Sequence, residues 1–266
     1  MIFSFPWPFH DTKRHQGEFS NVPLPKPSSF NEVDVSDKPA WVRNTPRLKS
    51  GDVSYLRWLY RQRLRSLQSV DEMVGRMVRI LKEQGELSNT YIVFTSDNGL
   101  HFGEHRIIAK KWTAYEEAID VPLLVRAPGV PRGVSRSQMA LNNDLAPTFA
   151  SFAGVTPPGF VDGRSLKPLL TSNPPSGRSA LLVEHWRDRN GDPYAAKIPD
   201  YKAVRTARYL FVRYANGERE LYDLSNDPHE RRNLRKSAPN RLKSRLASRL
   251  DALQNCARQG CRSAEN

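Results

Sequence analysis

Metal-ligating residue types follow directly after a short run of β-forming residues. Residues 91–95 read Tyr-Ile-Val-Phe-Thr, and Asp97 and Asn98 come just after them. A carboxylate and an amide carbonyl are hard oxygen donors of the kind that Ca²⁺ or Mg²⁺ takes in proteins. In open α/β sheets, ligands lie beyond the carboxyl ends of the strands. The pattern predicts a cation site at Asp97 and Asn98, with a plain Asp-Asn-Gly turn as the alternative.

Further polar residues follow within reach of this pair. His101, Glu104 and His105 could bring one or two more side chains into the same pocket. A zinc pair of the two histidines is a weaker interpretation, because the glycine between them argues against a stable helix. Lys110 or Lys111 lies close in sequence, and a lysine there would complement the charge of an anionic ester. The alternative for either lysine is an ordinary surface residue.

The elements around these residues follow an α/β order. Apolar residues spaced by three and four predict one long amphipathic helix over 52–85. A helix that feeds a strand through a short turn is half of a βαβ unit, so we expect a mostly parallel sheet with helices. Its predicted elements are strands at 91–95, 121–126 and 180–186, and a capped helix at 142–154.

The last third of the chain has a different pattern. Apolar and polar residues alternate over 201–228 across two turn signals, which predicts an antiparallel meander. Leucines at helical spacing over 242–253 predict a helix that covers this sheet. We expect an extended surface segment over 1–50, an α/β part over 51–186, and a small antiparallel subdomain with its helix over 187–266.

The chain is strongly basic, with a formal net charge of +13. Ten Arg or Lys and one acid, Asp251, lie between residues 231 and 262. This block could follow a polyanion, but it contains no base-stacking aromatics, so we favour a solvated helix face and expect no nucleic-acid partner. No apolar run approaches the roughly 20 residues that a spanning helix needs, so no transmembrane segment is predicted.

The two cysteines, Cys256 and Cys261, lie five residues apart near the C-terminal end. We favour a disulfide that closes this short loop over two free thiols. A disulfide would imply an oxidising compartment, because such bonds persist mainly outside the reducing cytosol. The opening residues have no basic leader and no small-residue cleavage site, so no signal peptide is predicted and the compartment stays open.

Five stretches of the chain, taken together, resemble the sulfatase family of the alkaline-phosphatase-like superfamily. They are TSDNGLHFGEHR, KKWTAYEEAIDVPLLVRAPGV, NNDLAPTFASFAGV, VDGRSLKPLL and ELYDLSNDPHERRNL, in that family's order and spacing. The stretch SFNEVDVSDKPAWVR is similar to the N-acetylglucosamine-6-sulfatase branch and its bacterial arylsulfatase relatives. The resemblance implies part of an alkaline-phosphatase-like α/β sandwich that hydrolyses the sulfate ester of an aryl compound or a sugar.

The resemblance also implies roles for single residues. Asp97 and Asn98 would bind Ca²⁺, with Mg²⁺ as the other choice, and Lys111 would contact the sulfate and take part in catalysis. His101 matches a histidine at the pocket rim, with the same two roles, and His10 is the candidate for a second sulfate-binding histidine. A divalent cation and a lysine would stabilise the charge shared among the sulfate oxygens as the ester bond breaks.

The family's nucleophile is the part of the site that we expect to be absent. It is a formylglycine, made within a Cys/Ser-x-Pro-x-Arg motif near the start of the enzyme, and an early strand with paired aspartates completes the cation site. Ca²⁺ takes 6 to 8 oxygens, and Asp97 with Asn98 supplies about two, so we expect a weak half-site. The expectation is a truncated chain, inactive alone, with uncovered apolar strand faces and a complementing N-terminal fragment as a partner.

Two other functions stay open on the sequence. One is a metal-dependent phosphoesterase or sulfatase that uses another nucleophile, for which Thr95, Ser96 and Thr113 are the candidates. The other is a non-catalytic protein that binds polyanions or sulfated glycans through the basic residues of 231–266. Turnover of a sulfate ester would favour an enzyme, and salt-sensitive retention on heparin would favour the binding protein.

Overall fold

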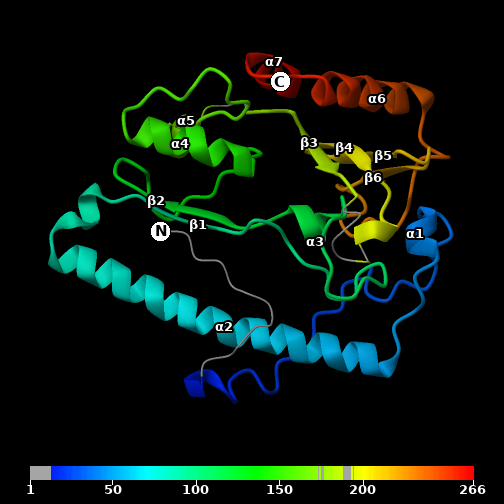
Figure 1. The fold of residues 1–266 in the computed structure, drawn as a ribbon, viewed down its shortest axis with the longest axis horizontal. Helices are drawn as coiled ribbons and strands as arrows, with labels where there is room; N and C mark the ends of the chain where they lie inside the picture. The colour runs from blue at the N-terminus through cyan, green and yellow to red at the C-terminus, as the bar shows by residue number, and fades with distance from the viewer. Residues whose placement is uncertain (1–12, 173, 175–176, 188–192, 194) are drawn as a thin grey trace.

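A computed structural model describes residues 13–172, 174, 177–187, 193 and 195–266 (Figure 1). The candidate His10 lies outside these residues, so its predicted role is not placed in space. Among the helices in the described ranges, none is both long and apolar enough to cross a membrane.

The predicted long helix is α2, Ser50–Glu83, which runs along one side of the molecule (Figure 1). Asp52 accepts a hydrogen bond from the backbone N–H of Lys49 at 2.8 Å and so caps the first turn. Gly85 takes a φ of 77° just after the helix, a left-handed conformation that glycine adopts readily. Leu56 is fully buried on the predicted apolar stripe, whereas Ile80 near the other end is 44% exposed.

Strand β1, Ile92–Thr95, pairs with strand β2, Leu123–Arg126, in an antiparallel ladder. A parallel pair was predicted here, and this prediction is wrong. Parallel strands need a crossover connection, usually a helix of several turns, that returns the chain to the starting end. The connection here contains only the four-residue helix α3, Glu116–Ile119, and it brings Leu123 back to the end of the strand where Thr95 lies.

The second sheet is antiparallel throughout, in the order β3-β4-β5-β6. Its strands are β3 (Ala180–His185), β4 (Tyr201–Thr206), β5 (Tyr209–Tyr214) and β6 (Arg219–Asp223). The meander was predicted, but the strand at 180–186 was placed in the α/β part. That placement is corrected, because β3 pairs with β4 along its whole length, from Ala180 opposite Thr206 to His185 opposite Tyr201.

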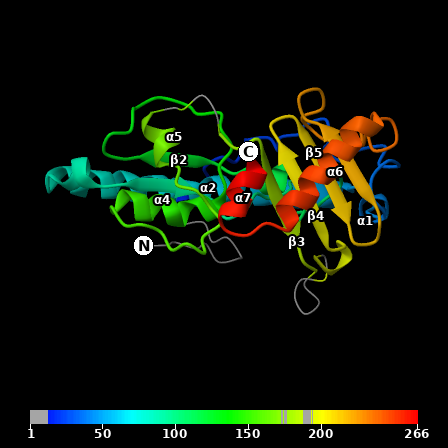
Figure 2. The same cartoon turned by 90° about the horizontal axis from the view of Figure 1, so that it is seen from above.

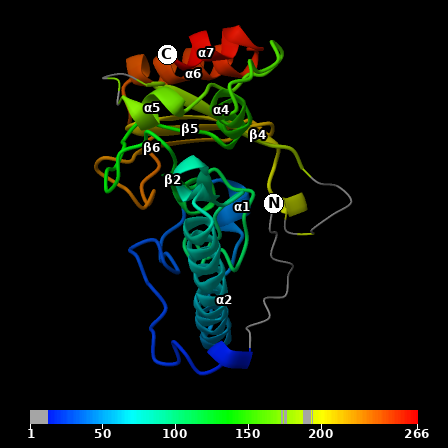
Figure 3. The ribbon, with the colours of Figure 1, turned by 90° about the vertical axis from the view of Figure 1, so that its left-hand side faces the viewer.

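Helices α6 and α7 cover one face of this sheet, as predicted for the leucine-rich helix (Figures 2 and 3). Leu246, Leu250 and Leu253 of α6 are buried against Val204 and Phe211 of the strands. Helix α6 spans Asn240–Gln254, and α7 spans Gln259–Glu265.

The other helical segments in the described residues are short. Helix α1 spans Ala40–Arg43, α4 spans Leu145–Phe152, and α5 spans Lys167–Thr171. Single 3-10 turns span Lys13–His15, Glu86–Asn89, Asn142–Asp144 and Ala195–Lys197.

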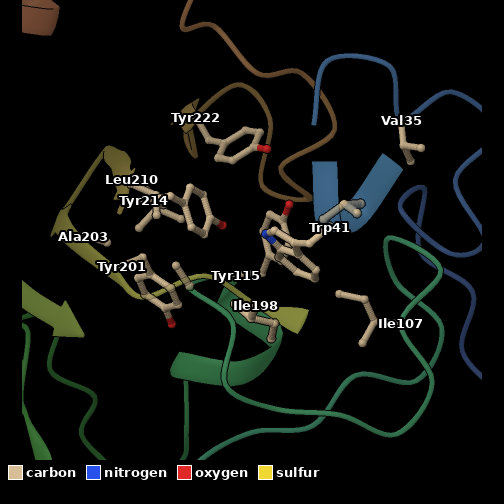
Figure 4. Packing of buried hydrophobic residues seen from close by; sticks show 13 residues of the cluster. Val35, Trp41, Ile107, Tyr115, Ile198, Tyr201, Ala203, Leu210, Tyr214 and Tyr222 are labelled. Atoms are coloured by element: carbon tan, nitrogen blue, oxygen red, sulfur yellow. The ribbon is translucent and has the colours of Figure 1, made fainter. Parts of the chain in front are cut away.

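The opposite face of the sheet packs on an aromatic cluster (Figure 4). Trp41 and Tyr115 reach this cluster from separate segments, and their ring centroids are 6.2 Å apart. The Trp41 side chain is 9% exposed and anchors the segment before α2 in this cluster. Successive side chains of β4 point to opposite faces of the sheet, so Ala203 packs in the aromatic cluster and Val204 packs against α6.

A buried ion network ties the C-terminal helix to the body of the chain. Arg178 donates to both carboxylate oxygens of Asp144, at 2.5 and 2.8 Å, and to Glu265 of α7 at 3.1 Å. Asp144 also accepts a hydrogen bond from the backbone N–H of Arg164. Cys256 and Cys261 form the predicted disulfide between α6 and α7.

Candidate functional site

The loop after β1 is held in place by the backbone of helix α3. The N–H of Gly99 donates to the carbonyl of Ala118 at 2.9 Å. A Cβ at this position would lie 2.0 Å from the carbonyl oxygen of Glu117, so only glycine allows the two segments to approach this closely. Glycine at position 99 therefore fixes where the residues just before it stand relative to α3.

Asp97 and Asn98 lie at the end of β1 with Lys111 beside them. The Lys111 Nζ donates to Asn98 Oδ1 at 3.1 Å, although 13 residues separate the two in sequence. One oxygen of Asp97 accepts the Asn98 N–H at 2.9 Å, and the Asp97 carbonyl accepts from the Asn142 side chain at 2.9 Å. Asp97 is exposed, whereas Asn98 and Lys111 are half-buried. The structure thus brings together three of the predicted site residues on one open surface.

His101 does not lie at a rim, which corrects the position predicted for it. Its ring is 0% exposed and its Nε2 lies 2.8 Å from the hydroxyl oxygen of Thr113. Burial lowers the pKa of His101 to about 3, so the ring is neutral at ordinary pH. Its backbone pairs with the segment that carries the lysines, because the His101 N–H donates to the Lys110 carbonyl at 2.9 Å. In this position the ring can orient the lysine segment from behind.

A second group of titratable side chains lies in the buried interior next to this loop. His105, Glu117 and Glu230 each present a potential metal-ligand atom within 4.8 Å of the other two. His105 Nδ1 lies 2.8 Å from a carboxylate oxygen of Glu32, and Lys38 is buried with its Nζ 4.0 Å from the other Glu32 oxygen. Sequence reasoning named His105 but missed the three acids, although all three stand within stretches that resemble the family.

Burial dominates the electrostatics of this interior group. It raises the pKa of Glu117 to about 7, with repulsion from Glu104 adding to the effect, and raises the pKa of Glu230 well above the ordinary glutamate value. Burial likewise raises the pKa of Glu32 to about 7, against the opposing charge of Lys38. For His105 burial lowers the pKa well below the ordinary value, so the ring carries no charge. The acids are consequently costly to keep ionised without a cation.

The alternative nucleophiles are not equally accessible. Thr113 is 2% exposed and is hydrogen-bonded to His101, which excludes it as an attacking group in this arrangement.

The nucleophile motif of the family was expected to be absent from the sequence, and as a sequence pattern it is present. Residues Ser237 to Arg241 read Ser-x-Pro-x-Arg, so that expectation is wrong. This stretch stands at the start of α6, which packs on the sheet face opposite to the aromatic cluster and Tyr115. Asp97 follows β1, which belongs to the other, two-stranded sheet.

Two sequence profiles match most of the chain between them. The profile described as Sulfatase matches residues 8–155, which is more than half of the chain. The chain belongs to the sulfatase family. The profile described as N-sulphoglucosamine sulphohydrolase, C-terminal, matches residues 103–256 of this sulfatase chain. The antiparallel sheet and α6 therefore correspond to a C-terminal part of that kind.

Known sulfatases resemble the chain over most of its length. An arylsulfatase of Volvox carteri is 38% identical, over 97% of this chain and 44% of the relative. An N-acetylglucosamine-6-sulfatase of Capra hircus is 33% identical, over 96% of this chain and 51% of the relative. The chain thus spans about half the length of these curated relatives, or less. A solved structure in complex with its substrate D-glucosamine-2-N,6-O-disulfate superposes with a TM-score of 0.78 at 26% identity, covering 92% of this chain and 62% of that one.

The solved neighbours and the mixed helix and sheet architecture establish an alkaline-phosphatase-like α/β fold with a small antiparallel sheet. The family implies a divalent cation, and the donors present at the end of β1 fit one in kind. Asp97 offers a carboxylate and Asn98 an amide oxygen, both of them hard donors, and Asp97 is open to solvent. In number they fall short, because Ca²⁺ takes 6 to 8 oxygens.

Proposed function

We propose that this sulfatase chain carries one half of a site that hydrolyses a sulfate ester to an alcohol and sulfate. The contact between Lys111 and Asn98 beside Asp97 carries this proposal. A cation and a cationic side chain on one surface suit an anionic sulfate, whose charge they would stabilise during bond cleavage. We assign Ca²⁺, with Mg²⁺ as the second choice, to Asp97 and Asn98.

The residues of this chain have separate tasks in the proposed reaction. Lys111 contacts the sulfate oxygens and, through Asn98, stays aligned with the cation ligands. His101 acts as a positioning residue behind it, because its buried ring bonds Thr113 and its backbone bonds Lys110. The bound cation would supply charge stabilisation, while the nucleophile comes from outside the residues assigned here.

We propose that a complementing segment covers the apolar faces beside this half-site. Leu124 of β2 is 59% exposed, and Phe94 of β1 is 39% exposed. Both strand faces were expected to be uncovered, and the exposed values support a partner that supplies the family's nucleophile and the remaining cation ligands. On this proposal the chain alone is inactive.

A sulfated amino sugar is the substrate class that we favour. The names of the N-acetylglucosamine-6-sulfatase and the solved substrate complex support a sulfated glucosamine, and the algal arylsulfatase supports an aryl sulfate as a practical assay substrate. The disulfide between Cys256 and Cys261 supports folding in an oxidising compartment.

Binding of inorganic sulfate in the presence of Ca²⁺ tests the half-site without the missing nucleophile. We expect calorimetry to detect weak binding by the wild-type chain and at least about tenfold weaker binding by Lys111→Ala, because a hydrogen bond to a charged group contributes about 1.5–3 kcal/mol. Lys110→Ala is the matched control and should bind like the wild type. Equal binding by both lysine variants and the wild type would remove Lys111 from the site.

A basic cavity supports a second candidate function, the binding of sulfated glycans. Arg219, Arg235, Lys236 and Lys243 line a surface cavity of about 440 Å³ between β6 and α6. Four cations around one hollow would attract a polyanion through its charge. If this function holds, the double variant Arg235→Ser/Lys243→Ser will elute from heparin at lower salt than a control double variant. The control, Arg132→Ser/Lys82→Ser, removes the same charge away from the cavity. Equal elution of the two double variants would contradict it.

A further inference from the structure

His105, Glu117 and Glu230 gather potential ligand atoms at one point in the interior. One such atom from each residue lies within 4.8 Å of those of the other two. The three residues come from the loop after β1, from helix α3 and from the loop after β6, so the fold brings them together from distant parts of the chain. The half-site at Asp97 and Asn98 uses none of them.

Each of these side chains ends in a buried polar atom without a hydrogen-bond partner in the described part of the chain. The atoms are Nε2 of His105, Oε2 of Glu117 and Oε1 of Glu230. His105 and Glu230 are both 0% exposed. Because buried polar atoms are nearly always hydrogen-bonded, three orphans at one point indicate a ligand that belongs between them.

The hydrogen bond on the far side of the His105 ring prepares it as a ligand. Nδ1 of His105 faces a carboxylate oxygen of Glu32 at 2.8 Å. A carboxylate in this place keeps the proton on Nδ1 and leaves the lone pair of Nε2 free. Metal-ligating histidines almost always have such a partner, which sets the tautomer and raises the basicity of the ring.

The charges around this point also favour a cation. Glu32, Glu117 and Glu230 bring three carboxylates together, and Lys38 is the one lysine buried among them in the described residues. Its Nζ donates to the backbone carbonyl of Glu230, so this one cation faces three carboxylates. Buried carboxylates are unfavourable in the ionised form without a counter-charge, and a divalent cation would offset two of them.

We propose that His105, Glu117 and Glu230 form a second, buried divalent-cation site of the Zn²⁺ class. One imidazole nitrogen and two carboxylate oxygens suit Zn²⁺ better than Ca²⁺, which prefers oxygen ligands alone. Glu32, which contacts His105, also lines a surface cavity of about 600 Å³, and we place the entry of the ion on that side. The ion would fasten α3 to the loops after β1 and β6, and so hold the lysine segment in place.

Metal loading of the full chain tests the site. The purified chain is stripped with a chelator, incubated with Zn²⁺, desalted and analysed for metal content, with thermal unfolding followed in parallel. We expect one Zn²⁺ per chain and a higher melting temperature with the ion. Glu117→Gln, whose side chain is partly exposed and keeps its shape, should lose at least about tenfold in Zn²⁺ affinity, and Glu32→Gln about 10–100-fold.

Asp97→Ala separates this site from the half-site, because it should keep full Zn²⁺ stoichiometry and the same shift in melting temperature. Substitution of Co²⁺ should give the visible absorption of a tetrahedral nitrogen and oxygen site in the wild type, and Glu117→Gln should lose that absorption while its circular dichroism stays unchanged. Absence of bound Zn²⁺ in the wild type, or equal retention by wild type and Glu117→Gln, would overturn the proposal.

Discussion

At the level of single residues, the account depends on where a few charged side chains stand and what surrounds them. Lys111 is half-buried against Asn98 at an open strand end, whereas Glu220 is fully enclosed. Tyr115, Tyr214 and Tyr222 all donate to the Glu220 carboxylate, at 2.7, 2.7 and 2.5 Å. The first environment suits ligand binding, and the second makes stability depend on protonation.

The pH dependence of stability should reveal Glu220. Burial raises the pKa of Glu220 above the ordinary value of 4.5, so the folded chain keeps this proton to higher pH than the unfolded chain does. The stability that it contributes is complete below 4.5 and is lost as pH rises through the folded pKa. We expect the difference in unfolding free energy between wild type and Glu220→Gln to shrink as pH rises above 4.5, as measured by chemical denaturation.

Glu184→Gln, on the edge strand β3, controls for the loss of one negative charge at a more exposed position. Its stability should run parallel to that of the wild type over the same pH range. A difference between wild type and Glu220→Gln that stays constant or grows with pH would show that burial does not raise this pKa.

At the level of elements, the contact between α3 and the loop after β1 fixes where the candidate site residues lie. Gly99→Ala should destabilise the chain by about 1–3 kcal/mol or more, because its Cβ would meet the Glu117 carbonyl at 2.0 Å and force the backbone apart. Gly75→Ala is the matched control, since nothing lies within 4 Å of that site in α2 and helix propensity predicts a gain of about 1 kcal/mol. Urea denaturation measures both. Equal effects of the two alanines would show that the close approach is not needed.

The ion network of α7 allows a second comparison between elements. Asp144→Ala should cost about 3–5 kcal/mol in unfolding free energy, because it leaves Arg178 buried without its bidentate partner. Asp251→Ala breaks a more exposed pair with Arg213, so its cost should stay within about 1 kcal/mol. If the two variants unfold at the same denaturant concentration, the buried network does not stabilise the docking of α7.

Periodicity predicts elements in this chain better than it predicts their partners. The helix α2, the meander and α6 follow from the spacing of apolar residues, which depends only on local geometry. The antiparallel pairing of β1 with β2 does not follow, because it depends on the path of the connection between them. Likewise Asp97 and Asn98 stand out as neighbours in sequence, whereas Glu32 and Glu230 meet His105 only through the tertiary fold.

At the level of the whole molecule, uncovered apolar surface should control the behaviour of the chain in solution. Phe94→Thr with Leu124→Thr should reduce self-association without loss of the fold, because it removes apolar area from an exposed sheet face. Light scattering coupled to size-exclusion chromatography measures the effect. Phe160→Thr, at a loop residue that is 71% exposed, should change little. A wild-type chain that is monomeric and unfolds cooperatively at high temperature would contradict the need for a partner.

The half-site proposal is tested most directly by complementation. The chain is co-expressed with the part of the Volvox carteri arylsulfatase that it does not match, where we expect the nucleophile motif of the family, and hydrolysis of an aryl sulfate is measured with Ca²⁺ present. We predict turnover only when both pieces are present, a loss of about 100-fold or more for Asp97→Ala and for Lys111→Ala, and little change for Lys110→Ala. Turnover by the chain alone, or by the pair regardless of Asp97 and Lys111, would contradict the account.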